Sequence, residues 1–386
     1  MTHHYFSPCP RGLESFLAAE LTELGARQPR ALPGGVAFEG DWSVGYRANL
    51  ESRLATRVLW RVALGRYRGE EEIYRLAYSA TWAKWWTPDQ SIRVQVTAQK
   101  SPLKSLEFIT LRIKDAVCDH FRTVTGRRPN VDTTRPDVRI HAFLSADQAT
   151  LYVDLSGEPL SKRGFKHAAV EAPLKENLAA GLLRIAGWQP DQPLVDPMCG
   201  SGTFLIEAAQ MALDVAPGLG RSFAFEKLKV FEADRWAALR RAAETRRRPI
   251  QGLTIYGSDR EADQVRRSLI NLRAAGLAEA VTLEEVDLLD RAAPSEAGVM
   301  IANPPYGVRI GDAEALAAFY PRLGDALKAR WTGWNCYLLS ADAQLPKLIG
   351  LKASRRTPVF NGALECRLFE YKMLAGSLRR PRTEDV

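Results

Sequence analysis

The sequence predicts an α/β protein in which a doubly wound, mainly parallel sheet ends in an antiparallel hairpin and follows a smaller α+β region. From Pro173 onward, short apolar strand candidates alternate with helical segments, which is typical of βα units. The last two strand candidates flank Asn361-Gly362, a strong signal for a hairpin turn. The chain has 386 residues, of which 46% are hydrophobic and 25% charged, so two or three globular domains are expected.

Helices and strands are mixed in the first 167 residues. The segment RGLESFLAAELTELG (11–25) has one apolar helical face, and GGVAFEG (34–40) is a strand candidate between glycines. Further helices are expected over 73–86 and 106–124, and further strands over 91–99, 138–146 and 149–157. Residues 88–168 hold 13 Lys and Arg against 9 Asp and Glu, a net charge of +4.

The second half begins with a helix in PLKENLAAGLLRIAGW (173–188), which Gly187 ends. Seven strand candidates follow, and the first five of them predict the parallel part of the sheet. They are residues 194–195, 253–256, 281–286, 299–302, 336–339, 354–359 and 364–371.

A long connection, residues 213–250, separates the first two of these strands. Its end is rich in arginine, with residues 235, 240, 241, 246, 247 and 248 against Glu244 alone. Such a run is usually a solvated helix face. The alternative is a patch that contacts phosphates, for which Arg246 and Arg247 are the candidates.

The charge and the cysteines limit the classes of partner and compartment. A net charge of +8 and a pI near 9.3 favour an anionic partner, with ordinary solubility charge as the alternative. No apolar run approaches the roughly 18 residues of a membrane span, and the N-terminus lacks a signal-peptide pattern. The five cysteines are scattered, without a Cys/His cluster. We expect a cytoplasmic protein with no membrane segment and no metal.

The segment PLVDPMCGSGTFLIEAA (193–209) predicts a strand, a tight loop and a helix in succession. Gly200 and Gly202 allow a ligand to approach the backbone, and Thr203 begins a helix whose unpaired N–H groups face the same crevice. Leu205 replaces the third glycine of the dinucleotide fingerprint, and no P-loop lysine follows. Asp196 would repel a pyrophosphate and attract an ammonium group. The pattern therefore indicates a nucleoside that carries an amino acid, rather than NAD.

Two further acids follow the second and third strands, Asp259 in IYGSDRE and Asp287 in LEEVDLLD. In open α/β sheets, ligands bind at the carboxyl ends of the strands. Asp259 is placed to accept ribose hydroxyls, and Asp287 to accept an adenine amino group. Each acid alone is more often a cap or a turn residue. Three acids at three successive strand ends indicate a ligand site.

The series DPMCGSG, GSDRE, EVDLLD and NPPYG resembles the class I S-adenosylmethionine-dependent methyltransferases that methylate amino groups. The resemblance extends to CPRGLE (9–14), VRIHAFLSADQATLYVDLSGEPLSKRGFK (138–166), APLKENLAAGLL (172–183) and APGLGRSFAFEK (216–227). These segments are similar to THUMP-containing RNA methyltransferases, most of all to the bacterial 23S rRNA guanine-N2 enzymes. The resemblance covers essentially the whole chain.

The resemblance implies four parts of the chain. They are an N-terminal ferredoxin-like region (1–68), a THUMP RNA-binding domain (69–167), a linking helix (168–190) and a Rossmann-like methyltransferase domain with a seven-stranded sheet (191–386). It also implies that S-adenosylmethionine is bound by Lys175, Asn177, Asp196, Pro197, Cys199, Gly200, Gly202, Thr203, Asp259, Asp287 and Asn303. The candidate contacts to RNA are Lys162, Arg163, Lys166, Arg246 and Arg247.

The implied reaction is methyl transfer to N2 of a guanine in 23S rRNA or a precursor of the large subunit, by a monomer. The alternatives are a tRNA guanine-N2 enzyme, an adenine-N6 nucleic-acid enzyme, a glutamine methyltransferase, and an RNA-binding module with an inactive site. Some bacterial relatives carry a second methyltransferase domain, which we expect to be absent because this chain ends in the polar segment SLRRPRTEDV.

The motif Asn303-Pro304-Pro305-Tyr306 ends a buried strand candidate, and alone it is typical of a turn. In a methyltransferase, the Asn303 side-chain oxygen and the Pro304 carbonyl can accept both N–H bonds of an exocyclic amine. This would direct the amine lone pair toward the methyl donor. The prolines keep the Pro304 carbonyl rigid, and Tyr306 offers a face on which the target base stacks.

Overall fold

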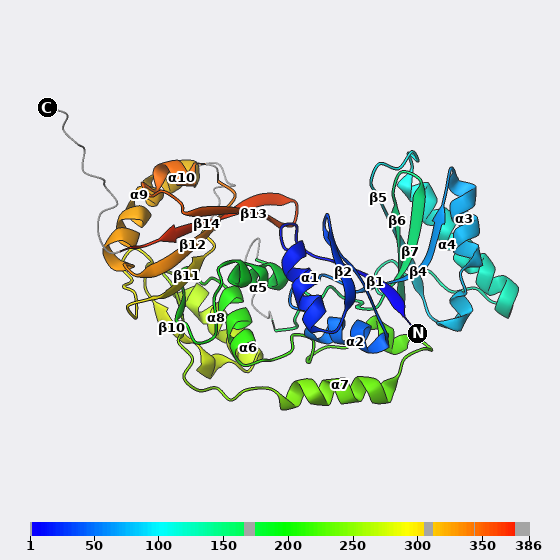
Figure 1. Ribbon diagram of the computed structural model, residues 1–386, viewed down its shortest axis with the longest axis horizontal. Helices are drawn as coiled ribbons and strands as arrows, with labels where there is room; N and C mark the ends of the chain where they lie inside the picture. The colour runs from blue at the N-terminus through cyan, green and yellow to red at the C-terminus, as the bar shows by residue number, and fades with distance from the viewer. Residues whose placement is uncertain (1, 166–173, 305–311, 343, 375–386) are drawn as a thin grey trace. The chain divides into compact units, whose positions relative to one another are not determined.

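Two seven-stranded sheets organise the chain, one in each of two units of the computed structural model (Figure 1). The structure describes residues 2–165, 174–304, 312–342 and 344–374. The first unit comprises Met1–Gly164 and Val215–Arg247, and the second comprises Phe165–Asp214 and Arg248–Val386. The expected methyltransferase domain, 191–386, is therefore interrupted by a segment that packs on the first unit.

The sheet of the first unit has the strand order β2-β3-β1-β4-β7-β6-β5. Only β5 and β6 are parallel among these pairs. Because β4 pairs with both β1 and β7, one continuous sheet runs through the expected ferredoxin-like and THUMP regions. The strands are β1 (His3–Pro8), β2 (Arg27–Leu32), β3 (Gly35–Gly40), β4 (Leu59–Arg66), β5 (Ile92–Ala98), β6 (Val138–Leu144) and β7 (Gln148–Asp154).

The helices of the first unit are α1 (Glu14–Glu23), α2 (Trp42–Glu51), α3 (Glu70–Ser79), α4 (Leu106–Thr125) and α7 (Ala233–Thr245), with short 3-10 turns η1 (Trp82–Lys84) and η2 (Ala224–Lys227). The expected helix over 106–124 is confirmed, and Gly126 ends it at φ +72°. The prediction of a single helix over 73–86 was wrong. The chain leaves the helix after Ser79 and turns so that Trp82 and Trp86 are fully buried, with the Trp82 indole donating to the Ala77 carbonyl.

An aromatic cluster explains why the segment Val215–Arg247 belongs to the first unit. Tyr46 of α2 lies against Phe225 and Trp236, with ring centroids 4.6 and 6.0 Å apart. The Tyr46 hydroxyl accepts the backbone N–H of Glu232 at 3.0 Å. Large aromatic rings dominate the free energy gained by burial, so this cluster fixes α7 beside α2.

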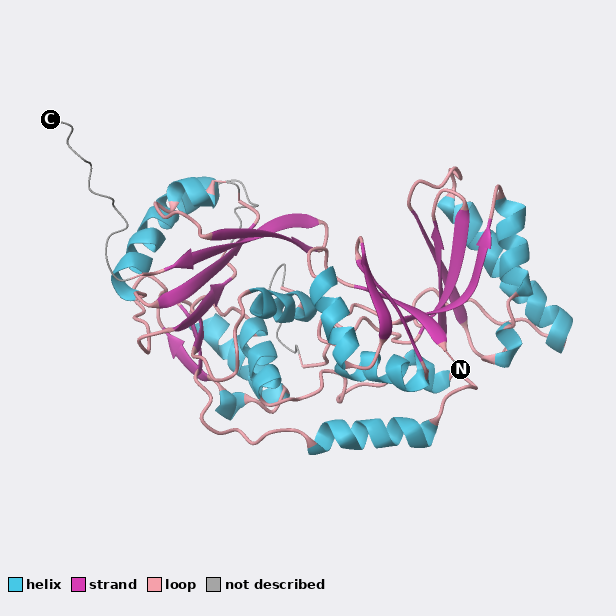
Figure 2. Ribbon diagram, in the orientation of Figure 1, coloured by secondary structure: helices cyan, strands magenta, loops and turns pink. Residues whose placement is uncertain are grey.

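The sheet of the second unit has the order β10-β9-β8-β11-β12-β14-β13 (Figures 1 and 2). Its first five strands are parallel and β14 is antiparallel to both neighbours, so the predicted doubly wound sheet with a C-terminal hairpin is confirmed. The strands are β8 (Leu194–Asp196), β9 (Ile255–Asp259), β10 (Thr282–Glu285), β11 (Gly298–Ala302), β12 (Trp334–Ser340), β13 (Arg355–Asn361) and β14 (Leu364–Lys372).

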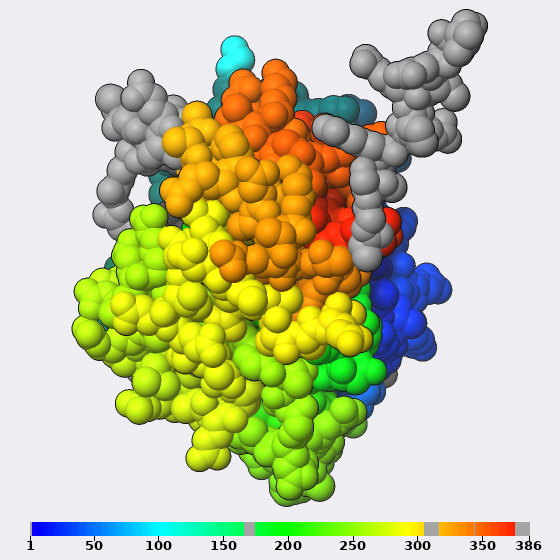
Figure 3. All heavy atoms as spheres, turned by 90° about the vertical axis from the view of Figure 1, so that its left-hand side faces the viewer, coloured from blue at the N-terminus to red at the C-terminus, as the bar shows by residue number. Residues whose placement is uncertain are grey.

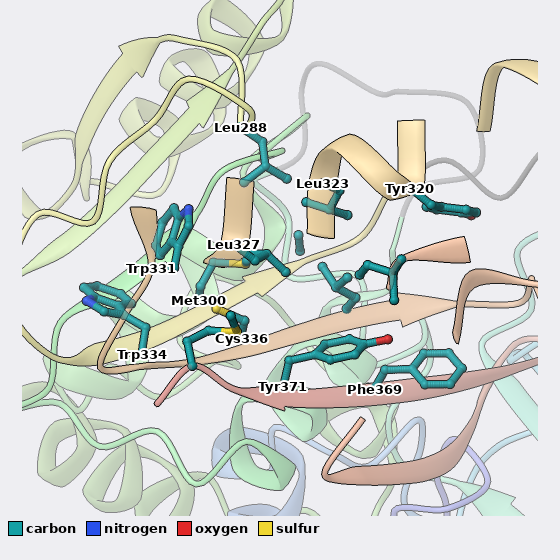
Figure 4. Close-up of a cluster of buried hydrophobic side chains, with 14 of the residues drawn as sticks. Leu288, Met300, Tyr320, Leu323, Leu327, Trp331, Trp334, Cys336, Phe369 and Tyr371 are labelled. Carbon is teal, nitrogen blue, oxygen red and sulfur yellow. The ribbon is translucent and has the colours of Figure 1, made fainter. Parts of the chain in front are cut away.

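Helices α5 (Glu176–Ile185), α6 (Thr203–Ala212), α8 (Ala262–Ala274), α9 (Asp312–Arg330) and α10 (Leu345–Leu348), with the 3-10 turn η3 (Ala278–Ala280), complete the second unit. Figure 4 shows Met300, Cys336 and Tyr371 of the sheet beneath Leu323 and Leu327 of α9, all of them buried. In the space-filling view of Figure 3, α9 (orange) and the segment around β10 (yellow) belong to one continuous surface. Among the described residues, no helix is long and apolar enough to cross a membrane.

We predict that Gly324→Ala destabilises the second unit. In the interior of a helix this change normally stabilises by about 1 kcal/mol. Here, however, the new Cβ of α9 would lie 1.8 Å from the Ile349 carbonyl oxygen, a backbone atom that cannot rotate away. Overpacking costs about 1–3 kcal/mol, and a backbone contact of 1.8 Å places this change at the upper end, so we expect a net loss of about 2 kcal/mol in urea denaturation. Gly220→Ala is the control, because its new Cβ meets no atom within 4 Å and its stability should not fall. A Gly324→Ala protein as stable as the wild type would contradict this packing.

Candidate active site

The loop between β8 and α6 is shaped by two glycines in the left-handed region, Gly200 at φ +52° and Gly202 at φ +79°. A Cβ added to Gly202 would lie 3.0 Å from the Ser268 hydroxyl, whereas one added to Gly200 would meet no described atom within 4 Å. The space in front of Gly200 is therefore open to a ligand. The predicted start of α6 at Thr203 is confirmed.

Buried polar residues of α8 hold this loop in place. The Ser268 hydroxyl donates to the Gly200 carbonyl at 2.8 Å, and the Asn271 amide donates to the Ser201 carbonyl at 3.0 Å. Both side chains are fully buried. The sequence analysis missed these two residues, since polar residues on a helix give only a weak signal until the buried side of that helix is known.

Gly257 of β9 allows close packing between helix and strand, which is the role of the third glycine in the dinucleotide fingerprint. A Cβ at this position would lie 2.3 Å from the end of the Leu205 side chain and 2.8 Å from that of Leu283. Leu205 of α6 therefore packs directly onto the strand backbone. A lone glycine inside a strand is the signal that could have identified this close approach.

The first two predicted acids lie together at the carboxyl ends of neighbouring strands. Asp196 ends β8 with 2% exposure, and its carboxylate accepts the Met198 N–H at 3.2 Å. Asp259 ends β9, and its carboxylate accepts the N–H groups of Gly200 at 3.1 Å and Glu261 at 3.2 Å. One oxygen of Asp259 thus links the end of β9 to the glycine loop.

Both carboxyl groups are held in surroundings that disfavour their charge. Burial raises the pKa of Asp196 to about 8, with the hydrogen bond from Met198 opposing this shift and the charge of Asp259 contributing to it. Burial also raises the pKa of Asp259. A buried acid with such a shift is typical of a functional site, and a cationic group beside it would favour the carboxylate.

Asp287 follows β10, the strand that lies next to β9 with Glu285 opposite Asp259. One carboxylate oxygen of Asp287 accepts the Leu289 N–H at 2.9 Å, which is a turn-forming role. The three predicted acids therefore follow three adjacent strands in the order β10-β9-β8. This row fits an elongated ligand with a cationic amino-acid end at Asp196 and a nucleoside toward Asp287.

The amide motif begins directly after β11, which runs parallel to β8 with Met300 opposite Val195. Asn303 and Pro304 thus follow the strand next to the one that carries Asp196, at the point where the strand order reverses. The predicted residues Pro305 and Tyr306 lie outside the described residues.

The other predicted cofactor residues occupy different environments. Pro197 and Cys199 are buried in the loop, and Thr203 is buried at the start of α6. Asn177 is buried in α5, which packs against α6. Lys175 is exposed just before α5. The Cys199 sulfur lies 3.4 Å from the Ser268 hydroxyl, and burial raises the pKa of this thiol, so it behaves as a small apolar filler. Among the described residues, no three His, Cys, Asp or Glu side chains are grouped to hold a metal ion.

One of the predicted RNA contacts is buried. Arg163 is 5% exposed and its guanidinium donates to the carbonyls of Leu160 at 2.6 Å and Arg53 at 2.7 Å, so it cannot reach a phosphate. The structure corrects this prediction: the arginine holds two loops of the first unit together. Lys162 is exposed and pairs with Glu158 at 2.9 Å.

The remaining predicted contacts differ in their surroundings. Arg246 pairs with Glu51 of α2, and Arg247 is exposed. Lys166 lies outside the described residues.

Three family models match the chain. An RlmL ferredoxin-like domain matches residues 4–59, a THUMP domain matches 67–154, and an RMKL-like methyltransferase domain matches 163–370. Together they account for most of both units.

Known proteins and solved structures agree with these models. A Synechocystis sp. protein named as a candidate RNA methyltransferase is 39% identical over 96% of this chain and 97% of its own length. The ribosomal RNA large subunit methyltransferase K/L of Allochromatium vinosum is 41% identical over 96% of this chain, which spans 52% of that relative.

A solved structure supports the same assignment. It is a candidate methyltransferase complexed with SAH, with a TM-score of 0.87 and 30% identity over 97% of this chain and 99% of its own. The chain spans about half the length of the K/L relatives and nearly the full length of the other two proteins. The chain therefore belongs to the RMKL-like methyltransferase family, in the form that carries RlmL ferredoxin-like and THUMP domains.

Proposed function

We propose that this chain transfers a methyl group from S-adenosylmethionine to N2 of a guanine in 23S rRNA. One observation carries the proposal: the glycine loop with Asp196 and Asp259 lies at the strand-order reversal beside Asn303, in a chain of the RMKL-like family. The relatives named for the ribosomal large subunit supply the RNA class.

The residues at the ends of β8 to β10 fit S-adenosylmethionine. Asp196 offers a buried carboxylate to an ammonium group, and the open space at Gly200 admits the ligand close to the backbone. Asp259 offers acceptors for ribose hydroxyls, and Asp287 one for the adenine amine. When bound, the cofactor supplies an electrophilic methyl group. The solved relative complexed with SAH, the demethylated cofactor, supports this assignment.

Asn303 and Pro304 are the residues proposed to receive the target amine. An exocyclic amine is a poor nucleophile, because its lone pair is delocalised into the base. The Asn303 oxygen and the Pro304 carbonyl would accept its two N–H bonds and so localise the lone pair on nitrogen. Fixing this geometry is worth several kcal/mol, up to about 7. The proposal includes Pro305 as a rigid support and Tyr306 as a stacking surface.

The proposal extends to the partner and the compartment. Lys162 and Arg247 are the exposed members of the predicted RNA contacts, and Arg246 is a third candidate if its pair with Glu51 opens. The described cysteines are all free and buried, which agrees with a reducing cytoplasm. We propose that the protein acts there as a monomer, which sedimentation can test.

We predict that Asp196 makes the ligand-free protein less stable as the pH rises. Its pKa is about 8 in the native state and about 4 when unfolded, so between these values only the native state holds the proton. The free energy of unfolding should therefore fall from about pH 4 to about pH 8. Asp196→Asn removes this titration, so its stability relative to the wild type should increase over the same range in urea denaturation. The exposed Asp263→Asn is the control, with no such trend expected.

The same variant should bind S-adenosylmethionine poorly. An ammonium group favours the ionised carboxylate, so cofactor binding near pH 7 should release a proton from wild-type Asp196. Calorimetry in two buffers of different ionisation enthalpy measures this release. If the wild type and Asp196→Asn release equal numbers of protons, Asp196 does not bind the ammonium group of the cofactor.

For Asn303→Ala, we predict nearly unchanged cofactor affinity and turnover lowered by about 10²-fold or more, as for other preorganised polar partners. The assay is nucleoside mass spectrometry of 23S rRNA incubated with labelled cofactor. Label in N2-methylguanosine that is lost in Asn303→Ala is the expected result. Label in N6-methyladenosine or on protein would overturn the proposed substrate, and undiminished N2-methylguanosine would overturn the role of Asn303.

A further inference from the structure

The sheet of the first unit has one face covered by helices and one face that is not. α1 contacts β2 and β3, while α3 contacts β4 and α4 contacts β5. Side chains that point toward the helices are buried, among them Phe38 of β3, Ile92 of β5 and Ile140 of β6. In Figures 1 and 2, α1, α3 and α4 lie on the outer sides of these strands, and no described helix of the first unit covers the other side. We call this other side the open face.

The strand registers place chemically related side chains together on the open face. Tyr152 of β7 is paired with Arg61 of β4. Two residues earlier on β7, Thr150 lies between Leu64 of β4 and Phe143 of β6. Residues that pair directly project to the same face of a sheet, so these five side chains form two adjacent rows.

The open face is rich in arginine. Arg30, Arg61 and Arg66 form no ion pair with any described residue. Two acids share the face: Glu39 pairs with His4 at 3.2 Å, and Asp154 is paired with Arg57. Arg139 pairs with Glu158 at 3.4 Å. The other arginines of the face form no ion pair with a described residue, so part of its positive charge is uncompensated. Its arginines are Arg27, Arg30, Arg61, Arg66, Arg93 and Arg139.

Two apolar side chains are exposed among these charges. Phe143 is 38% exposed and Leu64 is 44% exposed, although both lie on strands that have neighbours on each side. Unpaired RNA bases stack on aromatic rings, and arginines track the phosphates that connect them. A paired base offers no free face to a side chain within a sheet, so this combination favours an unpaired segment over a duplex.

We infer that the open face binds an unpaired segment of the RNA substrate, with a base stacked on Phe143 and phosphates at Arg61 and Arg66. The inference rests on the proposed function only in that the substrate is RNA. It assigns RNA binding to a sheet surface. None of the RNA contacts predicted from the sequence, from Lys162 to Arg247, belongs to that surface.

The test measures fluorescence anisotropy of a labelled oligoribonucleotide of about 12 nucleotides, within the roughly 4–16 that such surfaces cover, with the full chain and no cofactor. The double variant R61E/R66E should weaken binding and reduce the slope of log K against log salt by about 0.7 per lost contact. Phe143→Ala should weaken binding about 10-fold through lost stacking, and Phe143→Tyr should restore it.

Matched variants on the covered side act as controls. Arg75→Glu changes an exposed arginine of α3, and Phe108→Ala removes a phenylalanine of α4 that is 48% exposed. Both should leave the affinity within about twofold of the wild type, and circular dichroism should show that every variant is folded. Equal loss in the control and open-face variants would overturn the inference. So would an unchanged salt slope in R61E/R66E, or tighter binding of the duplex than of the single strand.

The outcomes separate this inference from the proposed function. The binding assay contains no methyl donor, so it does not depend on which base is methylated. Loss of binding in the open-face variants of a protein that methylates no guanine would uphold the surface and reject the proposed function. Normal RNA binding by those variants, in a protein that forms N2-methylguanosine, would reject the surface and uphold the proposed function.

Discussion

The parallel pairing of β8 between β9 and β11 is the constraint on which the candidate site depends. β8 has only three residues, and Leu194 and Val195 are fully buried. Its backbone bonds fix where the chain leaves the sheet, and hence where the glycine loop begins. A hydrogen bond from the Gly200 N–H of that loop reaches Asp259 on one side, while Asn303 follows the strand on the other side. A strand too short to be stable alone is therefore aligned by its two neighbours.

The site also shows how function and stability oppose each other in this fold. Asp196 is buried where its charged form is disfavoured, and the nearby Asp259 adds like-charge repulsion. Such an arrangement destabilises the protein on its own and favours a cationic ligand. The hydrophobic cluster between the sheet and α9 contributes the burial that offsets this local cost, with Trp331 and Trp334 at one end (Figure 4).

The sequence was most informative where the chemistry is local. The alternation of strands and helices predicted the parallel strands of the second sheet, and Asn361-Gly362 predicted its antiparallel hairpin. Gly257, Ser268 and Asn271 were missed, because their roles depend on which helix packs onto which strand.

The errors have the same origin. Arg163 looked like an exposed cation, but backbone carbonyls from a distant loop enclose it. Residues 73–86 have helical periodicity, yet burying Trp82 and Trp86 requires a turn. The grouping of Val215–Arg247 with the first unit depends on aromatic contacts between residues about 180 positions apart, which no local pattern reveals.

The continuous sheet of the first unit bears on how such proteins can be divided. β4 connects the segments that match the ferredoxin-like and THUMP models. Its backbone pairs with β1 of the first segment and with β7 of the second. A fragment that begins at residue 67 would lack β4 and leave the β7 backbone unpaired along one edge. Exposed strand edges pair readily with other chains and cause aggregation. For gene fusion or domain exchange, the ferredoxin-like and THUMP segments thus form a single module, and a breakpoint between them is unsuitable.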